Sequence, residues 1–181
     1  GWLTDGDSID LGIHEGLVLS TGIAATISNG SNLPGGNWTT TITNPDLSTL
    51  TGFPTYDLAQ LDFDFVATGD SVTFQFVFGS TEYPEWVGSS FNDIFGFFLS
   101  GPGIAGTFTN GAVNIALVPG TGEFVSINTI NATQNANLYV DNTNNLQNFM
   151  VDGYTVPMFA SIGGLTVGEA YHITLAIADA S

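Results

Sequence analysis

Lysine and arginine are absent from this chain of 181 residues, which has 17 acidic side chains and a formal net charge of −17 at pH 7. Because no side chain can neutralise phosphate, nucleic acid and anionic lipid heads are not expected as partners. Schiff-base chemistry and lysine–asparagine crosslinks are also excluded. Clustered carboxylates in such a chain must be solvated, accept hydrogen bonds or bind metal cations.

Cysteine is absent too, so the chain forms no disulfide and no thiolate metal site. The sequence has no secretory signal pattern and no apolar run of about 18 residues, so direct membrane insertion is not expected. The chain begins at Gly1 without a methionine. We therefore expect a mature product or an excised piece of a longer protein.

Apolar residues are present in ordinary amounts, at 43% of the chain, and include 14 Phe, 3 Trp and 5 Tyr. A chain of this length buries roughly 70% of its unfolded surface when it folds around one core. Low charge therefore does not indicate disorder here. We expect residues 1–181 to form a single folded domain.

Alternation with a period of two dominates the pattern, which predicts β-strands rather than helices. In residues 61–66 the apolar side chains alternate with Asp62 and Asp64, and residues 72–78 alternate after the turn 67–70. These two segments predict a β-hairpin with one buried face. Many short strands with frequent turn signals indicate an all-β fold, an antiparallel two-sheet β-sandwich or jelly roll.

Further strands are expected at several places along the chain. They are residues 15–20, 39–43, 94–99, 113–118, 124–130, 155–160 and 170–178. Pro157 predicts an edge strand or a bulge in its segment, because proline cannot donate to a sheet ladder. The asparagine-rich stretch 128–148 predicts a long loop.

The densest polar cluster lies in residues 79–101, where two apolar strands are joined by a loop with several oxygen ligands. These are Glu82, Glu85, Asn92 and Asp93. Carboxylates crowded beside buried aromatic residues repel one another and lose solvation. A bound Ca²⁺ relieves both effects, because it accepts about six to eight oxygen ligands. The alternative is a solvated acidic loop in which the asparagine and its neighbouring aspartate cap turns.

Other polar residues give weaker signals. Asp141, with Asn142, Asn144 and Asn145, forms an oxygen-rich stretch that is a second candidate for Ca²⁺, or simply a turn. Asp62 and Asp64 are expected on a solvated strand face, with a second cation as the alternative. With two histidines and no cysteine in the chain, a zinc site is not expected at His172.

Two motifs stand close together in the middle of the chain, residues 81–85 (TEYPE) and residues 91–99 (FNDIFGFFL). Together they resemble the central signature of the choice-of-anchor L domain family, and the resemblance extends to residues 16–22, 114–121, 152–157 and 171–179. It therefore covers nearly the whole chain, in order. It implies a bacterial exported protein whose location is extracellular or at the cell surface.

The resemblance also raises an expectation about the ends of the chain. Family members usually continue beyond residues 178–181 into another apolar strand, and they have an earlier first strand. If those strands are missing from the protein, an open sheet edge beside residues 171–178 could accept a strand from a neighbouring copy. The alternative is that the chain is a fragment.

We interpret the chain as a non-enzymatic structural or adhesive module stabilised by Ca²⁺. One alternative is a filament subunit that exchanges strands with copies of itself. Another is a calcium-dependent lectin for surface glycans, with Trp38 and Trp86 as stacking platforms for sugar rings. A glycosidase that uses Glu82 and Glu85 is a further alternative. It is not favoured, because no nucleophile elbow, HExxH motif or phosphate loop is present.

Overall fold

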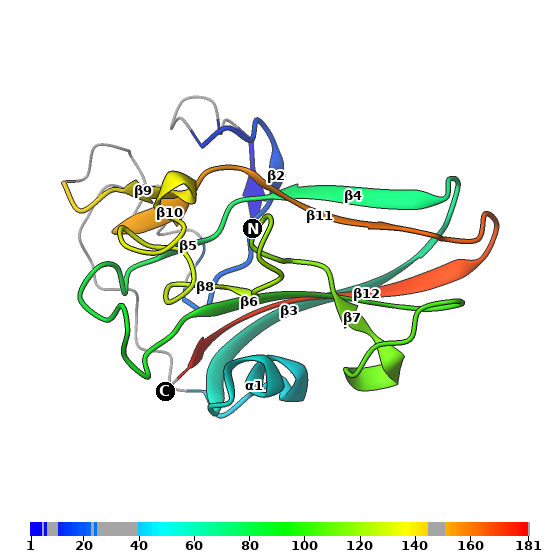
Figure 1. The fold of residues 1–181 in the computed structure, drawn as a ribbon, viewed down its shortest axis with the longest axis horizontal. Coiled ribbons are helices and arrows are strands. Elements are labelled where there is room, and N and C mark those ends of the chain that lie inside the picture. The colour runs from blue at the N-terminus through cyan, green and yellow to red at the C-terminus, as the bar shows by residue number, and fades with distance from the viewer. Residues whose placement is uncertain (5, 7–10, 23, 25–39, 145–150, 181) are drawn as a thin grey trace.

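The computed structural model describes residues 1–4, 6, 11–22, 24, 40–144 and 151–180. The fold is all-β with antiparallel sheets, as the sequence predicts, and two layers of strands enclose the main core (Figure 1). The structure is consistent with a β-sandwich. The jelly-roll topology stays a prediction.

The larger sheet has five strands in the order β3 (Thr55–Val66), β12 (Ala170–Ala180), β6 (Ile94–Ser100) and β7 (Val113–Asn114), with β8 (Val125–Ser126) also paired to β6. All of these pairs are antiparallel. Because β12 has a partner along both of its edges, the open edge expected beside residues 171–178 is wrong.

The facing layer is a ribbon of β4 (Ser71–Phe76) and β11 (Met158–Gly163). The predicted hairpin of residues 61–66 and 72–78 is therefore wrong, since β3 pairs with β12 and β4 pairs with β11. The connections 67–70 and 164–169 lie side by side instead. Ala67 N donates to Glu169 O at 2.9 Å, and Leu165 N donates to Asp70 O at 2.9 Å. The chain thus crosses twice from one layer to the other at the same end of the molecule (Figure 1).

Aromatic side chains fill the space between the layers. The ring of Phe74 on β4 lies 4.8 Å from that of Phe97 on β6, and Phe76 lies 5.1 Å from Phe95. Ile173 and Tyr171 on β12 are buried in the same cluster. The odd-numbered residues of β12 therefore face the core, and its even-numbered residues are left for the outer face.

The outer face of the large sheet is partly covered by α1 (Pro45–Thr51), seen below the sheet in Figure 1. Leu47 of α1 is fully buried against Phe98 and Ala176 in a second, smaller core. Gly96 makes this contact possible, because a Cβ there would lie 2.8 Å from Leu47 Cδ2. The helix begins at Asn44, whose side chain accepts hydrogen bonds from Asp46 N and Leu47 N.

Short elements complete the fold. They are β1 (Trp2–Leu3) paired with β2 (Gly16–Leu17), the sheet of β5 (Gly79–Ser80), β10 (Gly153–Thr155) and β9 (Tyr139–Asp141), and the 3₁₀ turns η3 (Thr109–Gly111) and η4 (Ala136–Leu138). The predicted loop 128–148 thus contains η4 and β9, and its last part, 145–148, lies outside the described residues.

Several of the expected strands differ in the structure. In the segments 15–20, 113–118 and 124–130, only the two-residue strands β2, β7 and β8 form. Residues 40–43 form no strand, although Thr40 O and Ile42 O accept hydrogen bonds from Asp57 N and Leu58 N on β3. Residue 39 lies outside the described residues. The expected strand 155–160 is divided between β10 and β11, and Pro157 lies in the break. The edge strand predicted at this proline agrees with β11, which pairs with β4 alone among the strands that the structure describes.

Candidate functional site

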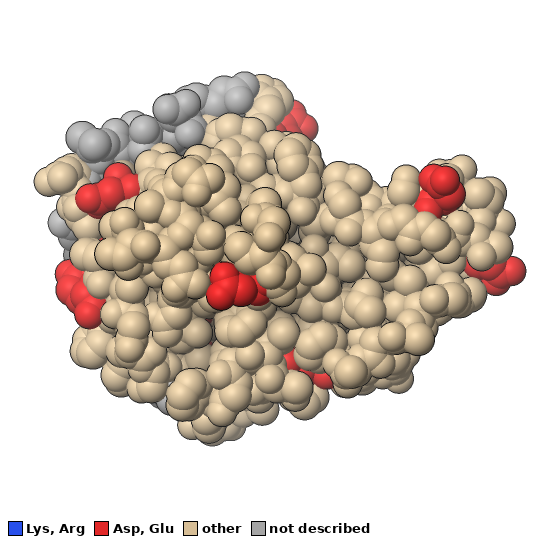
Figure 2. Space-filling model, viewed as in Figure 1, with Lys and Arg blue, Asp and Glu red and all other residues tan. Residues whose placement is uncertain are grey.

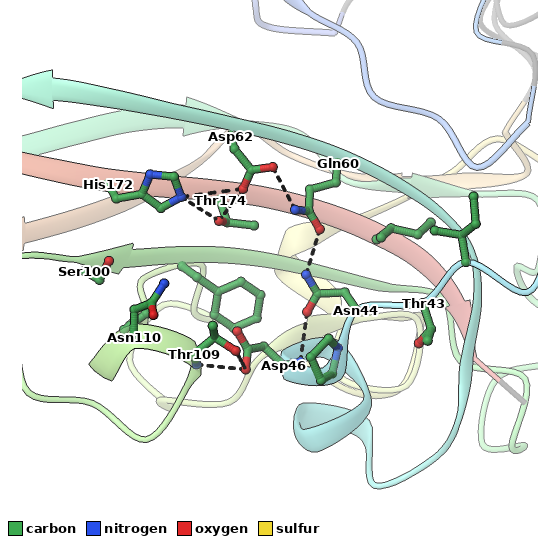
Figure 3. Close-up of a pocket in the computed structure, with 15 residues that line it drawn as sticks. Thr43, Asn44, Asp46, Gln60, Asp62, Ser100, Thr109, Asn110, His172 and Thr174 are labelled. Atoms are coloured by element: carbon green, nitrogen blue, oxygen red, sulfur yellow. Dashed lines mark hydrogen bonds and ion pairs between the residues drawn. The ribbon is translucent and has the colours of Figure 1, made fainter.

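A groove of about 580 Å³ lies on the outer face of the large sheet, between α1 and η3 (Figure 3). Its volume is in the range typical of small-molecule pockets. The side chains around it are mainly amides, hydroxyls and carboxylates, with a few apolar residues. They are Ile42, Thr43, Asn44, Pro45, Asp46, Leu58, Gln60, Asp62, Phe98, Ser100, Thr109, Asn110, Ala112, His172 and Thr174.

Strand register places the polar residues of the sheet in this groove. His172 on β12 lies opposite Asp64 on β3 and Ser100 on β6, and Thr174 lies opposite Asp62 and Phe98. Side chains directly opposite one another in an antiparallel sheet share a face. The polar alternation of β3 and β12 therefore produces one continuous polar surface across both strands.

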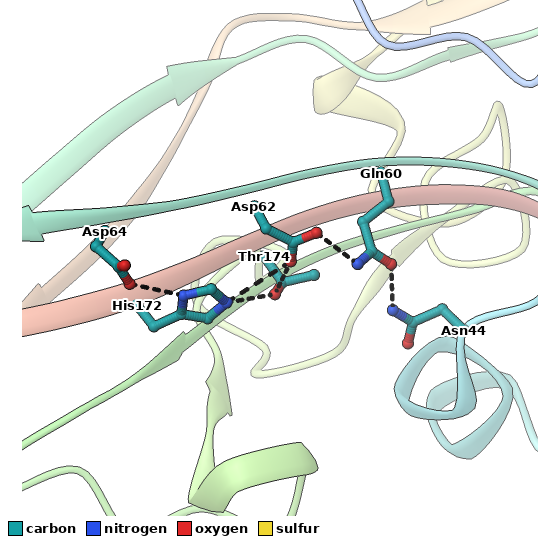
Figure 4. Close-up of polar contacts among 6 residues, drawn as sticks. All are labelled: Asn44, Gln60, Asp62, Asp64, His172 and Thr174. Atoms are coloured by element: carbon teal, nitrogen blue, oxygen red, sulfur yellow. Dashed lines mark hydrogen bonds and ion pairs between the residues drawn. The ribbon is translucent and has the colours of Figure 1, made fainter.

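Hydrogen bonds join this surface to the start of α1 (Figure 4). Thr174 Oγ1 donates to Asp62 Oδ1 at 2.6 Å, and Gln60 Nε2 donates to Asp62 Oδ2 at 2.8 Å. Gln60 Oε1 in turn accepts from Asn44 Nδ2 at 2.8 Å. Because each group holds the next, the wall of the groove is ordered before any ligand arrives.

Burial alone would raise the pKa of Asp62, but hydrogen bonds from Thr174 and Gln60 and the attraction of His172 together lower it. This carboxyl is therefore ionised near neutral pH. On the opposite side of the groove, Asp46 Oδ1 accepts hydrogen bonds from Thr109 N and Thr109 Oγ1, both at 3.0 Å. The groove thus has a carboxylate on each side.

His172 connects two carboxylates of β3. Its Nδ1 lies 2.8 Å from Asp64 Oδ1, and its Nε2 lies 3.7 Å from Asp62 Oδ1 and 3.4 Å from Thr174 Oγ1. The order Asp64–His172–Thr174 resembles a hydrolase triad, in which the hydroxyl gives its proton to the imidazole. Here the hydroxyl proton of Thr174 points to Asp62 instead.

The residues predicted to bind Ca²⁺ lie at another end of the molecule. Among them, Asp93 is deeply buried and accepts a hydrogen bond of 2.6 Å from Ser80 Oγ. Burial and the neighbouring Asp179 raise the pKa of Asp93 to about 8. Burial, together with the charges of Asp179 and Glu85, also raises the pKa of Glu82. The structure therefore brings Glu82 and Asp93 together with Asp179, which the sequence analysis did not select.

The remaining predicted metal ligands make other contacts. Asn92 Oδ1 accepts a hydrogen bond from Asn128 N at 3.1 Å. The backbone and hydroxyl of Thr143 both donate to Asp141 Oδ1 and lower the pKa of this exposed carboxyl. Glu85 interacts electrostatically with Asp152, whose pKa is raised by burial and by the charges of Glu85 and Asp141. Within the described ranges, no three His, Asp or Glu side chains are arranged to hold a metal ion.

Of the two tryptophans predicted to contact a ligand, the structure describes only Trp86. Trp86 is half-exposed, and its ring packs edge-on against Phe91 at 4.8 Å. This pair is separate from the groove beside α1. Trp38 lies outside the described residues.

The sequence analysis did not identify Asn44, Gln60 or Thr174 as site residues. A signal for α1 is present, since Asn44 is a preferred N-cap, Pro45 occupies the first helical turn, and Gly52 adopts the left-handed conformation at the C-cap. Nothing in the sequence, however, indicates that this helix start approaches Gln60.

The sequence pattern of the choice-of-anchor L domain family matches residues 3–181, and the chain belongs to this family. No curated protein and no solved structure matches the chain.

Membership of this family makes the chain a module of an exported or cell-surface protein. Choice-of-anchor domains are surface-anchoring modules rather than known enzymes. Among the helices that the structure describes, none is long and apolar enough to cross a membrane.

Proposed function

We propose that this chain is an adhesive module that binds glycans at the bacterial surface, in the groove beside α1. The observation behind the proposal is the hydrogen-bonded wall of Asn44, Gln60, Asp62 and Thr174 along a groove of about 580 Å³. Sugar hydroxyls both donate and accept hydrogen bonds, so this mixture of amides, a hydroxyl and a carboxylate suits them.

The apolar part of the groove supports the same ligand class. Phe98, Leu58 and Ile42 line it beside the polar residues. Sugar rings have apolar C–H faces that pack against such side chains, while their hydroxyls reach the polar wall. Sequence composition sharpens the proposal, because a chain without lysine and arginine has no fixed cation with which to hold a sulfated or carboxylated glycan.

A glycan array tests the proposal. The chain, labelled at its N-terminus, is applied to neutral, acidic and amine-containing glycans, once with calcium and once with a chelator. Binding to neutral or amine-containing glycans is expected, and sulfated glycans should give no signal. An array blank under both conditions would contradict the proposal.

Two variants locate the binding site. Asp62→Asn removes a groove carboxylate and is expected to weaken binding, whereas Trp86→Ala removes the half-exposed aromatic ring outside the groove. Binding that survives in the first variant but is lost in the second would move the site to the loop of Trp86.

Calcium remains part of the proposal as a stabilising ion. Glu82, Asp93 and Asp179 affect one another electrostatically, and burial raises the pKa of each carboxyl. Carboxylates that are costly to ionise together favour a divalent cation. The filament alternative has less support, because β12 is paired along both edges.

A further inference from the structure

The two carboxylates of the groove are held by neutral hydrogen-bond donors. Asp46 accepts from the backbone and hydroxyl of Thr109, and Asp62 accepts from Gln60 and Thr174. His172 Nε2, at 3.7 Å from Asp62, is the nearest side chain able to take a positive charge. Hydrogen bonds from neutral groups orient a carboxylate without compensating its charge, so Asp62 gains only the partial compensation that His172 provides.

Apart from His172, the side chains of the chain add no fixed positive charge to the groove. The chain has no lysine and no arginine against 17 acidic residues. On the face of the molecule shown in Figure 2, the visible acidic side chains form separate patches. A cationic group placed in the groove between Asp46 and Asp62 therefore meets attraction from both sides and from the net charge of the protein.

From these charges we propose that the groove selects glycans with free amino groups, that is, sugars whose amine is protonated and lies beside Asp62. This inference rests on the proposed function, because it specifies the ligand of the same site. The pyranose ring would lie against Leu58 and Ile42, which line the groove beside the polar wall. The hydroxyls next to the amine would face the amides of Asn44 and Asn110 across the groove (Figure 3).

A sugar is favoured over a lysine-rich peptide by the other lining residues. The amides of Asn44 and Gln60 and the hydroxyls of Ser100 and Thr109 surround the groove, and they match a ligand that has several hydroxyl, amine and ether groups around one ring. A lysine side chain has an apolar stem with one charged end. It would add few hydrogen bonds to those that these polar groups already make within the protein.

The experiment is isothermal titration calorimetry with two oligosaccharides of equal length, one of β-1,4-linked glucosamine and one of β-1,4-linked N-acetylglucosamine. At about pH 6 the amine is protonated, since free amines of this kind titrate near or above neutrality. We expect the deacetylated oligosaccharide to bind at least about tenfold more tightly, and added salt should reduce this preference.

Two matched variants distinguish the effect of a carboxylate in the groove from the effect of the protein's net charge. Asp62→Asn and Asp70→Asn each remove one negative charge, but Asp70 lies in the connection between β3 and β4, away from the groove. Asp62→Asn is expected to remove most of the preference for the amine, and Asp70→Asn to leave it unchanged. Equal losses in both variants would show non-specific attraction and would overturn the inference.

The remaining outcomes distinguish the inference from the proposed function. If the acetylated oligosaccharide binds as tightly as the deacetylated one, the preference for an amine is wrong while glycan binding stands. If neither binds and the array is blank, the proposed function itself fails. A tetralysine peptide that binds as tightly as the glucosamine oligomer would overturn the assignment to a sugar.

Discussion

Ser80 Oγ on β5 donates a hydrogen bond of 2.6 Å to Asp93 Oδ2, in the residue that precedes β6. Asp93 also hydrogen-bonds to Asp179, near the end of β12. Two carboxyls in contact cannot both ionise without strong repulsion, so the pair shares a proton. The contact between Asp93 and Asp179 therefore joins the end of β12 to the loop before β6.

The shared proton predicts how stability depends on pH. Burial and the neighbouring Asp179 raise the pKa of Asp93 to about 8 in the folded chain, from the ordinary value of 3.8 for an aspartate in the unfolded chain. Between these pH values the folded state holds a proton that the unfolded state has lost, so stability falls as the pH rises. The slope is up to about 1.4 kcal/mol per pH unit for one proton, and it levels off above about pH 8. Urea denaturation across this interval measures it.

Asp93→Asn provides the control, since the amide can still accept from Ser80 and donate to Asp179 without ionising. The variant is expected to lose most of the slope and to be more stable than the natural chain at about pH 8. A natural chain with equal stability at about pH 5 and pH 8 would contradict the shared proton. At lower pH the sign reverses, because the pKa of Asp62 and that of Asp141 are lowered and their stabilisation is lost as the pH falls through them.

A side chain at position 96 is expected to disturb the contact between α1 and the large sheet. A Cβ at this position would lie 2.5 Å from Phe98 Cε2 and 2.8 Å from Leu47 Cδ2. Because both side chains are buried, Gly96→Ala is expected to cost about 1–3 kcal/mol of unfolding free energy. Gly163→Ala in β11 is the matched control, since its Cβ would have no neighbour within 4 Å, and it should change stability by less than about 0.5 kcal/mol. Similar losses in both variants would argue against the close approach.

Asn44 has two roles that substitutions can separate. Its Oδ1 caps α1, and its Nδ2 donates a hydrogen bond to Gln60. Asn44→Ala removes both and is expected to lower the unfolding free energy by about 0.5–2 kcal/mol. Asn44→Asp keeps the cap but cannot donate to Gln60, so its stability should stay within about 0.5 kcal/mol of the natural chain. Chemical denaturation of the three proteins checks this. Equal losses in the two variants would mean that the contact with Gln60, not the cap, stabilises the helix.

The alternation of the strands was sufficient to predict which side chains face the core. Asp62 and Asp64 lie on the outer face of β3 while Phe63 and Phe65 pack against the core, as the pattern indicates. Pairing was not predictable in this way. A turn such as 67–70 suits a hairpin and a crossing between layers equally well, and β3 finds its partner in a strand more than 100 residues away.

The groove could not be predicted from the sequence, because it too depends on which strands pair. Sequence analysis favours residues that are close along the chain, such as Glu82, Glu85, Asn92 and Asp93. The groove instead depends on pairs such as Asp62 and Thr174, which are 112 residues apart. Their hydrogen bond follows from the register of β3 and β12, and register is set by the packing of the whole core.

Calcium provides a prediction for the acidic end of the molecule. Glu82 and Asp93 repel each other and Asp179 in the folded chain, so a divalent cation that binds there should stabilise the fold. Ligand linkage gives about 2.7 kcal/mol at a free concentration 100 times the dissociation constant. We expect the melting temperature to rise with added calcium and to return to its starting value with a chelator.

Glu82→Gln tests where the cation binds, with Asp141→Asn as the control. Glu82 lies beside the Asp93–Asp179 pair, whereas the Asp141 carboxylate is already hydrogen-bonded to Thr143. The calcium-dependent rise should shrink in the first variant and persist in the second. A melting temperature that calcium leaves unchanged in the natural chain would contradict the site, and the carboxyls would then be stabilised by their shared proton alone. A loss confined to Asp141→Asn would instead place the ion at the end of β9.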